Sequence, residues 1–159
     1  MVLRLLYAIL LTLLPGTELR LGLPLAMLYA QENGISLILI FLLIVLINIL
    51  LIFIIFFFLD YLHGWLMNFK FYEKFFKDSL KRFQKRVDKF EKRHAALGFI
   101  ALTLFVAVPL PGTGAWSGSL VSWVLGLDRK KSILSIALGV LIAGLLIFLG
   151  MLGFLSLFS

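Results

Sequence analysis

Two stretches of the chain decide its fold: LLPGTELRLGLP, residues 13–24, and PLPGTGAWSG, residues 109–118. Each places Pro-Gly-Thr in the middle of an apolar segment. Proline has no amide hydrogen and disfavours helix in the residue before it, so each segment should break into two short helices. Helix breaks at corresponding positions of two halves are the best sequence indication of a transporter's binding site.

The composition is that of an integral membrane protein. Hydrophobic residues make up 62% of the 159 residues, and the mean hydropathy is +1.11. Two uncharged runs, 35–59 and 132–158, exceed the roughly 18 apolar residues that span a bilayer. We therefore predict one all-α membrane domain, 1–159, with transmembrane helices at 35–59 and 132–158. No clear cleavage site follows the N-terminal apolar run, so we expect no removed leader.

The arms of the two broken segments are too short to cross a bilayer. Leu5–Leu14 has ten residues, or about 15 Å of helix against a hydrocarbon core of about 30 Å. We predict re-entrant hairpins at 1–30 and 97–127, in which the chain turns at mid-membrane and leaves on the side it entered. One transmembrane helix follows each hairpin. The two repeats are therefore expected to be inverted.

The basic residues test this arrangement against four kinked full crossings. Ten of the fifteen lie between Lys70 and Arg93, and three more form Arg129–Lys131. Cytoplasmic loops are enriched in Lys and Arg. Re-entrant hairpins place segment 70–93 and Arg129–Lys131 on the cytoplasmic side together, whereas a kinked crossing at 97–127 separates them. The pattern favours the re-entrant arrangement, in a multi-pass protein of a prokaryotic cytoplasmic (inner) membrane.

The basic segment also carries one apolar stripe. Apolar residues from Phe69 to Phe90 recur at spacings of three and four, which predicts a cytoplasmic amphipathic helix over 66–96 between the repeats. Such a helix lies on anionic lipid headgroups. The alternative is a heptad-like contact with a partner subunit. Nucleic acid is not an expected partner, because basic helices beside membrane spans usually bind headgroups.

Glu18 and Arg20 are the ionisable residues expected at membrane depth. Facing lipid would cost about 3 kcal/mol or more for each, so both should face protein, water or each other. In a functional interpretation, Glu18 carries a coupling proton and Arg20 holds an anionic substrate group. In a structural interpretation, Glu18 caps its own half-helix, and Arg20 binds carbonyls or the opposite hairpin.

Thr17 and Thr113 follow the turn glycines Gly16 and Gly112, and they are expected to cap the second arm of each hairpin. If the inverted hairpins meet, two helix N-termini converge at mid-membrane. Their free amides would then form a site for an anion such as phosphate. The two tips together are therefore the candidate substrate site.

Four further residues are candidates for the same site, three of them with a structural alternative. Gly114 permits close backbone approach, or packs helices as part of Gly114-x-x-x-Gly118. Ser117 adds a hydroxyl. Trp116 stands in the second repeat where Arg20 stands in the first, and could stack on a substrate or simply be a buried aromatic. Asn48, midway along the first span, either joins helices or lines the path.

Nothing in the sequence indicates an enzyme. The chain has no cysteine, and His63 and His94 lie far apart. No Ser-His-Asp order, P-loop or dinucleotide fingerprint is present. We therefore expect no catalytic residue, metal or cofactor.

The two motifs, LPGTELRLGLP (14–24) and PLPGTGAWSG (109–118), resemble those of the small multi-drug export protein family. The resemblance covers nearly the whole chain and implies a small membrane exporter. The chain is also distantly similar to the DedA/VTT proteins, whose re-entrant hairpins carry Pro-Gly-Glu-type and Arg motifs. That superfamily is associated with moving polyprenyl-phosphate or other lipids. Here the carboxylate lies one residue further from Pro-Gly, and the second tip has no charge.

Together these features predict a transporter or flippase for a small amphiphilic substrate, either lipid-phosphate-like or drug-like, with proton coupling through Glu18 as an option. The alternative is a non-transporting scaffold whose basic helix binds lipid or a partner. An ion channel is disfavoured, because no polar stripe lines a full span. A homodimer is expected, because a chain this small would need a second copy to enclose a path.

Overall fold

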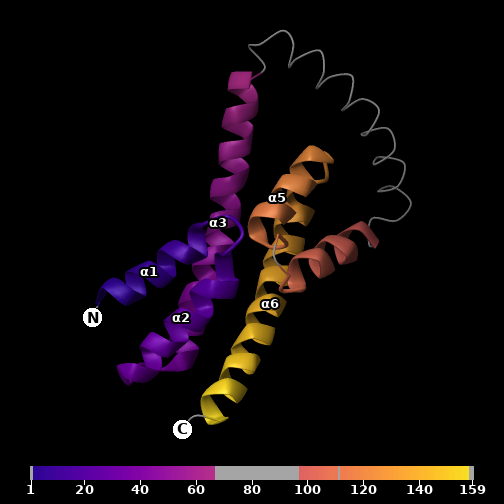
Figure 1. The fold of residues 1–159 in the computed structure, drawn as a ribbon. Helices are drawn as coiled ribbons and strands as arrows, with labels where there is room; N and C mark the ends of the chain where they lie inside the picture. Colours follow the sequence, from indigo (N-terminus) through magenta and orange to yellow (C-terminus); the bar gives the residue numbers. More distant parts are fainter. Residues whose placement is uncertain (1, 67–96, 111, 158–159) are drawn as a thin grey trace.

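The computed structural model describes residues 2–66, 97–110 and 112–157. These residues form helices joined by short turns, with no strand among them, which confirms the all-α class (Figure 1). The helices are α1 (Val2–Leu13), α2 (Glu18–Glu32), α3 (Leu37–Leu66), an unlabelled helix over Leu97–Ala107, α5 (Ala115–Val124) and α6 (Arg129–Leu157).

Two helices are long and apolar enough to span a membrane, as predicted. Helix α3 has 30 residues and α6 has 29, or about 45 and 44 Å at 1.5 Å per residue. Their most apolar windows reach mean hydropathies of 3.6 and 2.7. Both extend beyond the uncharged runs, because α3 continues past Asp60 and α6 begins at Arg129. The charged residues therefore mark the ends of the spans without ending the helices.

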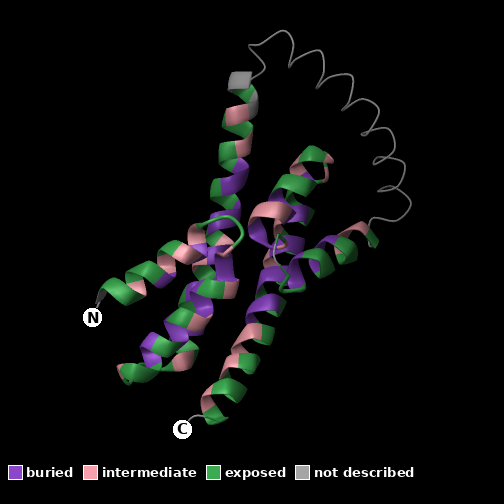
Figure 2. Ribbon diagram, viewed as in Figure 1, coloured by how far each residue is buried: buried purple, intermediate pink, exposed green. Residues whose placement is uncertain are grey.

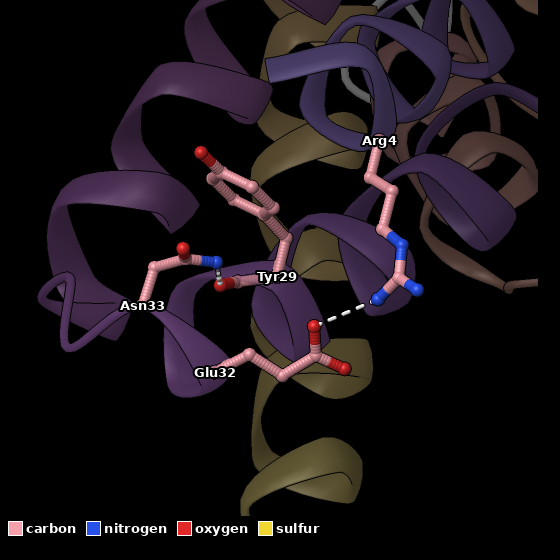
Figure 3. Close-up of polar contacts among 4 residues, drawn as sticks. All are labelled: Arg4, Tyr29, Glu32 and Asn33. Atoms are coloured by element: carbon pink, nitrogen blue, oxygen red, sulfur yellow. Dashed lines mark hydrogen bonds and ion pairs between the residues drawn. The ribbon is translucent and has the colours of Figure 1, made fainter. Parts of the chain in front are cut away.

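The first broken segment is a helical hairpin. Helices α1 and α2 lie side by side and run in opposite directions (Figure 1). At the open end, Arg4 Nη1 lies 2.9 Å from Glu32 Oε2, across 28 residues of chain (Figure 3). Near the tip the helices touch through Gly22, where an added Cβ would lie 1.9 Å from Thr12 Oγ1. A missing side chain thus lets the two arms pack closely.

The second broken segment also turns back on itself. The helix Leu97–Ala107 and α5 leave a common tip, and the first hairpin opens the opposite way, toward the lower left of Figure 1. The helix Leu97–Ala107 packs closely against α6 at Gly139. A Cβ added to Gly139 would lie 2.6 Å from Val106 Cβ. The two tips meet near the middle of the molecule. How the hairpins lie in a bilayer is not part of the structure, so re-entrance stays a prediction.

The core runs along the contacts of α2 with α3 and α6 and continues through the joined tips, and the outer helix faces are apolar and exposed (Figure 2). Leu39, Phe57 and Leu149 are 64%, 72% and 62% exposed. Soluble monomers rarely expose apolar surface on this scale, so these faces suit lipid. The predicted amphipathic helix at 66–96 falls almost entirely on residues 67–96, which lie outside the described residues, as does Pro111.

Candidate functional site

The carboxylate of Glu18 joins the two hairpin tips. Its Oε2 accepts the N–H of Ala115 at 2.9 Å, and its Oε1 accepts the N–H of Trp116 at 3.0 Å. Glu18 is 3% exposed and lies 97 and 98 residues from these partners. An anion is favoured at a helix N-terminus, where the amides have no partner within the helix. Glu18 therefore caps α5 of the opposite hairpin, and not its own half-helix as the structural interpretation supposed.

The backbone at both tips makes this contact possible. Glu18 has a φ of +39°, which is unusual for a residue with a side chain. Gly114 is the N-cap of α5, with a φ of 141°. A Cβ on Gly114 would lie 2.0 Å from Glu18 Oε2. The carboxylate thus occupies the space that a side chain at position 114 would need, and the turn glycines Gly16 and Gly112, at φ 90° and 84°, reverse the chain.

The tip threonines were predicted to cap the helices that follow them, and only Thr17 occupies that position. Thr17 is the N-cap residue of α2, but its side chain makes no capping hydrogen bond. Thr113 is not the N-cap residue of α5. Thr17 Oγ1 donates to the carbonyl of Leu11 at 2.6 Å, and Thr113 Oγ1 donates to that of Val108 at 2.6 Å. Helix ends leave their last carbonyls without partners. Each threonine therefore satisfies the end of the arm before it, and the N-cap position of α5 is taken by Gly114.

Two further side chains reach across between the tips, one from each hairpin. Arg20 Nη2 donates to Thr113 Oγ1, and Trp116 Nε1 donates to the Leu13 carbonyl at 3.0 Å. Arg20 and Trp116 hold equivalent positions after the two Pro-Gly-Thr motifs. The expectation that Arg20 binds the opposite hairpin matches this contact. Its Nε is buried with no hydrogen-bond partner among the described residues.

A cavity of about 330 Å³ opens beside the joined tips. Its lining combines predicted residues with three apolar residues that sequence reasoning missed, Ile55, Leu59 and Leu120. The predicted residues in the lining are Gly16, Glu18, Gly112, Thr113, Trp116 and Ser117, and Pro15 completes it. Nothing marks Ile55 or Leu59 in the sequence, because they are ordinary apolar residues of a span. Thr17, Arg20, Gly114 and Asn48 do not line the cavity.

Asn48 lies apart from the cavity, in the contact between α3 and α1. It is fully buried, and its Nδ2 donates to the carbonyl of Thr12 at 3.4 Å. Its Oδ1 finds no partner in the described part of the chain. The geometry matches the interpretation of Asn48 as a residue that joins helices.

Asp60 links α3 to α5 and α6 at the end of the molecule where the second hairpin opens. Asp60 of α3 accepts a hydrogen bond from Trp123 Nε1 of α5 at 2.8 Å and pairs with Arg129 of α6. Arg129 also lies 5.1 Å from the centre of the Phe56 ring. Sequence reasoning missed this cluster, although an acid ending one span and a base beginning the next was a usable signal.

At the opposite end, the Arg4–Glu32 pair borders a second cavity, of about 450 Å³, between α1 and α2. Tyr29 lies beside this pair, and its carbonyl accepts from Asn33 Nδ2 at 2.8 Å (Figure 3). Among the described residues, no group of three or more His, Asp or Glu could hold a metal ion.

Comparison with known protein families identifies a match over most of the chain. A family model described as "Putative small multi-drug export protein" matches residues 18–146. The matched range begins at Glu18 and includes Arg20 and the whole second tip. Searches of curated proteins and of solved structures found no match.

Proposed function

The chain belongs to the small multi-drug export protein family, and from that membership we propose that it exports small amphiphilic molecules across a membrane. The family and the two candidate spans favour a transporter over an enzyme. One observation carries the placement of the site: a buried carboxylate from one hairpin seated on the helix N-terminus of the other, beside a cavity. We place the substrate there.

The proposal includes an inverted pair of half-membrane hairpins. The hairpins open in opposite directions (Figure 1), and α1, with 12 residues, measures about 18 Å, or half of a bilayer core. Ion pairs mark the two ends of the molecule, Arg4–Glu32 at one and Asp60–Arg129 at the other. The positive-inside rule puts Arg129–Lys131 at the cytoplasmic face of a prokaryotic inner membrane. The substrate would then bind near mid-membrane, and a homodimer would help to enclose its path.

The carboxylate of Glu18 is the natural switch in this arrangement. Ionised, it accepts hydrogen bonds from two amides at once. Protonated, it loses its charge and must place a proton on one of the two oxygens, so it cannot accept both bonds equally well. Hydrogen bonds to a charged group contribute about 1.5–3 kcal/mol each. Proton binding would therefore loosen the tips, and proton release would close them, which couples a pH gradient to exposure of the cavity.

Transport in liposomes tests this function. The purified protein would be reconstituted, and the efflux of a panel of amphiphilic dyes measured with and without a pH gradient. We expect gradient-dependent transport by the wild type that falls at least about tenfold in Glu18→Gln.

The matched control is Glu32→Gln, which removes an exposed carboxylate of the same chain and should leave transport unchanged. No transport of any dye would refute the exporter and favour the non-transporting scaffold. Equal transport by wild type and Glu18→Gln would refute the site.

A further inference from the structure

Building on the exporter function proposed above, we propose that the tip cavity selects lipophilic organic cations, with Glu18 as their counter-charge. Among the described residues, one ionisable side chain lines the cavity, the carboxylate of Glu18. Arg20 does not line it, and one arm of its guanidinium is engaged with the Thr113 hydroxyl. A ligand in the cavity therefore contacts the negative charge of Glu18 directly. The positive charge of Arg20 is bound to Thr113 and does not line the cavity.

Several of the donors that an anion would need are already used. The first two amides of α5, those of Ala115 and Trp116, bind Glu18. At the start of α2, the amides of Arg20 and Leu21 bond to the Thr17 carbonyl at 3.1 and 3.3 Å. The hydroxyls of Thr17 and Thr113 donate to carbonyls of the preceding arms. These donors at the converging helix N-termini, expected from sequence to hold a phosphate-like anion, are thus engaged within the chain.

The remaining walls suit an apolar cation. Ile55, Leu59 and Leu120 supply aliphatic surface, and the Trp116 indole supplies an aromatic surface. Aromatic rings attract cations, and more strongly where water is excluded. The volume of about 330 Å³ is at the lower end of small-molecule sites. A hydrophilic cation would lose much of its hydration energy on entering this cavity. A cation with bulky apolar substituents is weakly hydrated, so it loses little.

Glu18 can neutralise one positive charge at a time, so a lipophilic cation and a proton compete for it. Protonation also weakens its bonds to α5, as argued above. Acid on one side of the membrane would therefore release a bound cation on that side, which gives cation–proton exchange through one carboxyl group.

The test compares two ions of nearly the same shape and opposite charge, tetraphenylphosphonium and tetraphenylborate. Each would be dialysed separately to equilibrium against the protein in nanodiscs, with empty nanodiscs subtracted. We expect saturable binding of tetraphenylphosphonium, at least about tenfold weaker in Glu18→Gln and weakened by acid. Tetraphenylborate should not exceed its binding to empty nanodiscs. Saturable tetraphenylborate binding at equal or higher affinity would overturn the inference, as would tetraphenylphosphonium binding unchanged in Glu18→Gln.

Two further variants keep the test decisive if Glu18→Gln folds poorly. Glu18→Asp keeps the charge and should retain more tetraphenylphosphonium binding than Glu18→Gln. Leu120→Trp narrows the cavity from a half-exposed position and should weaken binding with Glu18 intact. Wild-type affinity in Leu120→Trp would overturn the placement of the site.

The same reagents separate this inference from the exporter function. Saturable tetraphenylphosphonium binding, with no transport in liposomes of this ion or of any dye in the panel, refutes the exporter and leaves the cation site. Glu18-dependent transport of tetraphenylborate refutes the cation site and leaves the exporter.

Discussion

Replacing Glu18 by glutamine should destabilise the protein by about 2 kcal/mol, and the structure allows the estimate to be built step by step. Glutamine keeps the shape of the side chain but has one acceptor oxygen where glutamate has two. One of the two amides, that of Ala115 or Trp116, would then face an NH₂ group. A buried donor left without its partner costs about 1–3 kcal/mol.

Two smaller effects act in opposite directions. Removing a negative charge from the N-terminus of α5 costs a further 0.3–1 kcal/mol or so. Against this, Glu18 is 3% exposed, and a neutral side chain avoids part of the penalty of burying a charge. The two roughly cancel, so the unsatisfied amide decides the outcome, at about 2 kcal/mol.

The assay is reversible unfolding in mixed micelles with increasing SDS, followed by far-UV circular dichroism. Glu32→Gln is the control, because it breaks an ion pair whose side chains are 75% and 59% exposed, and such pairs contribute about 0–1 kcal/mol. Ala115→Pro adds a specific check. It removes one of the two amides at the first position of α5, where proline is compatible with a helix. The double variant should lose less free energy of unfolding than the sum of the losses in Ala115→Pro and Glu18→Gln.

A Glu18→Gln protein as stable as the wild type would refute this account of the tips. Fully additive losses in the double variant would show that Glu18 and the Ala115 amide do not act together.

Three more outcomes follow from the structure. Single cysteines at Gln31 and Lys130, in a chain with no native cysteine, should react with an impermeant maleimide from opposite sides of the membrane, and labelling from one side would contradict inverted hairpins. Gly22→Ala should cost about 1–3 kcal/mol in SDS unfolding through overpacking, since its Cβ would lie 1.9 Å from Thr12 Oγ1, and adding Thr12→Ala should restore part of the loss. Gly150→Ala meets no atom within 4 Å and should stabilise α6 by up to about 1 kcal/mol, whereas a loss would reveal a second copy packed on that face.

The sequence was sufficient for the parts of the fold that depend on local chemistry. The Pro-Gly turns end one helix and start the next, so the positions of both tips could be read directly. Uncharged length identified α3 and α6 as candidate spans. The cost of placing Glu18 and Arg20 in lipid implied that both face protein, water or each other, and both contact the opposite tip.

The sequence was not sufficient for the direction in which side chains point. Glu18 begins α2, and a carboxylate there is ordinarily assigned to its own helix. Its φ of +39° belongs to a backbone conformation that is rare for residues with side chains, and no local pattern predicts it. The contacts of Asp60 were missed because its partners Trp123 and Arg129 are 63 and 69 residues away along the chain.

The two tips are equivalent in sequence, and their differences are complementary. Position by position, Glu18 corresponds to Gly114, and Arg20 corresponds to Trp116. Two carboxylates brought together here would repel, and two glycines would leave both helix N-termini without an acceptor. The Glu18 carboxylate fits between the tips only if the residue at the equivalent position, 114, has no side chain. A Cβ on Gly114 would lie 2.0 Å from Glu18 Oε2, which is too close for both atoms to fit. Gly114 therefore has two effects: it leaves the second tip without a charge, and it leaves the space that the Glu18 carboxylate of the first tip occupies. For this reason, Gly114→Ala should impair the site as severely as the loss of Glu18 itself.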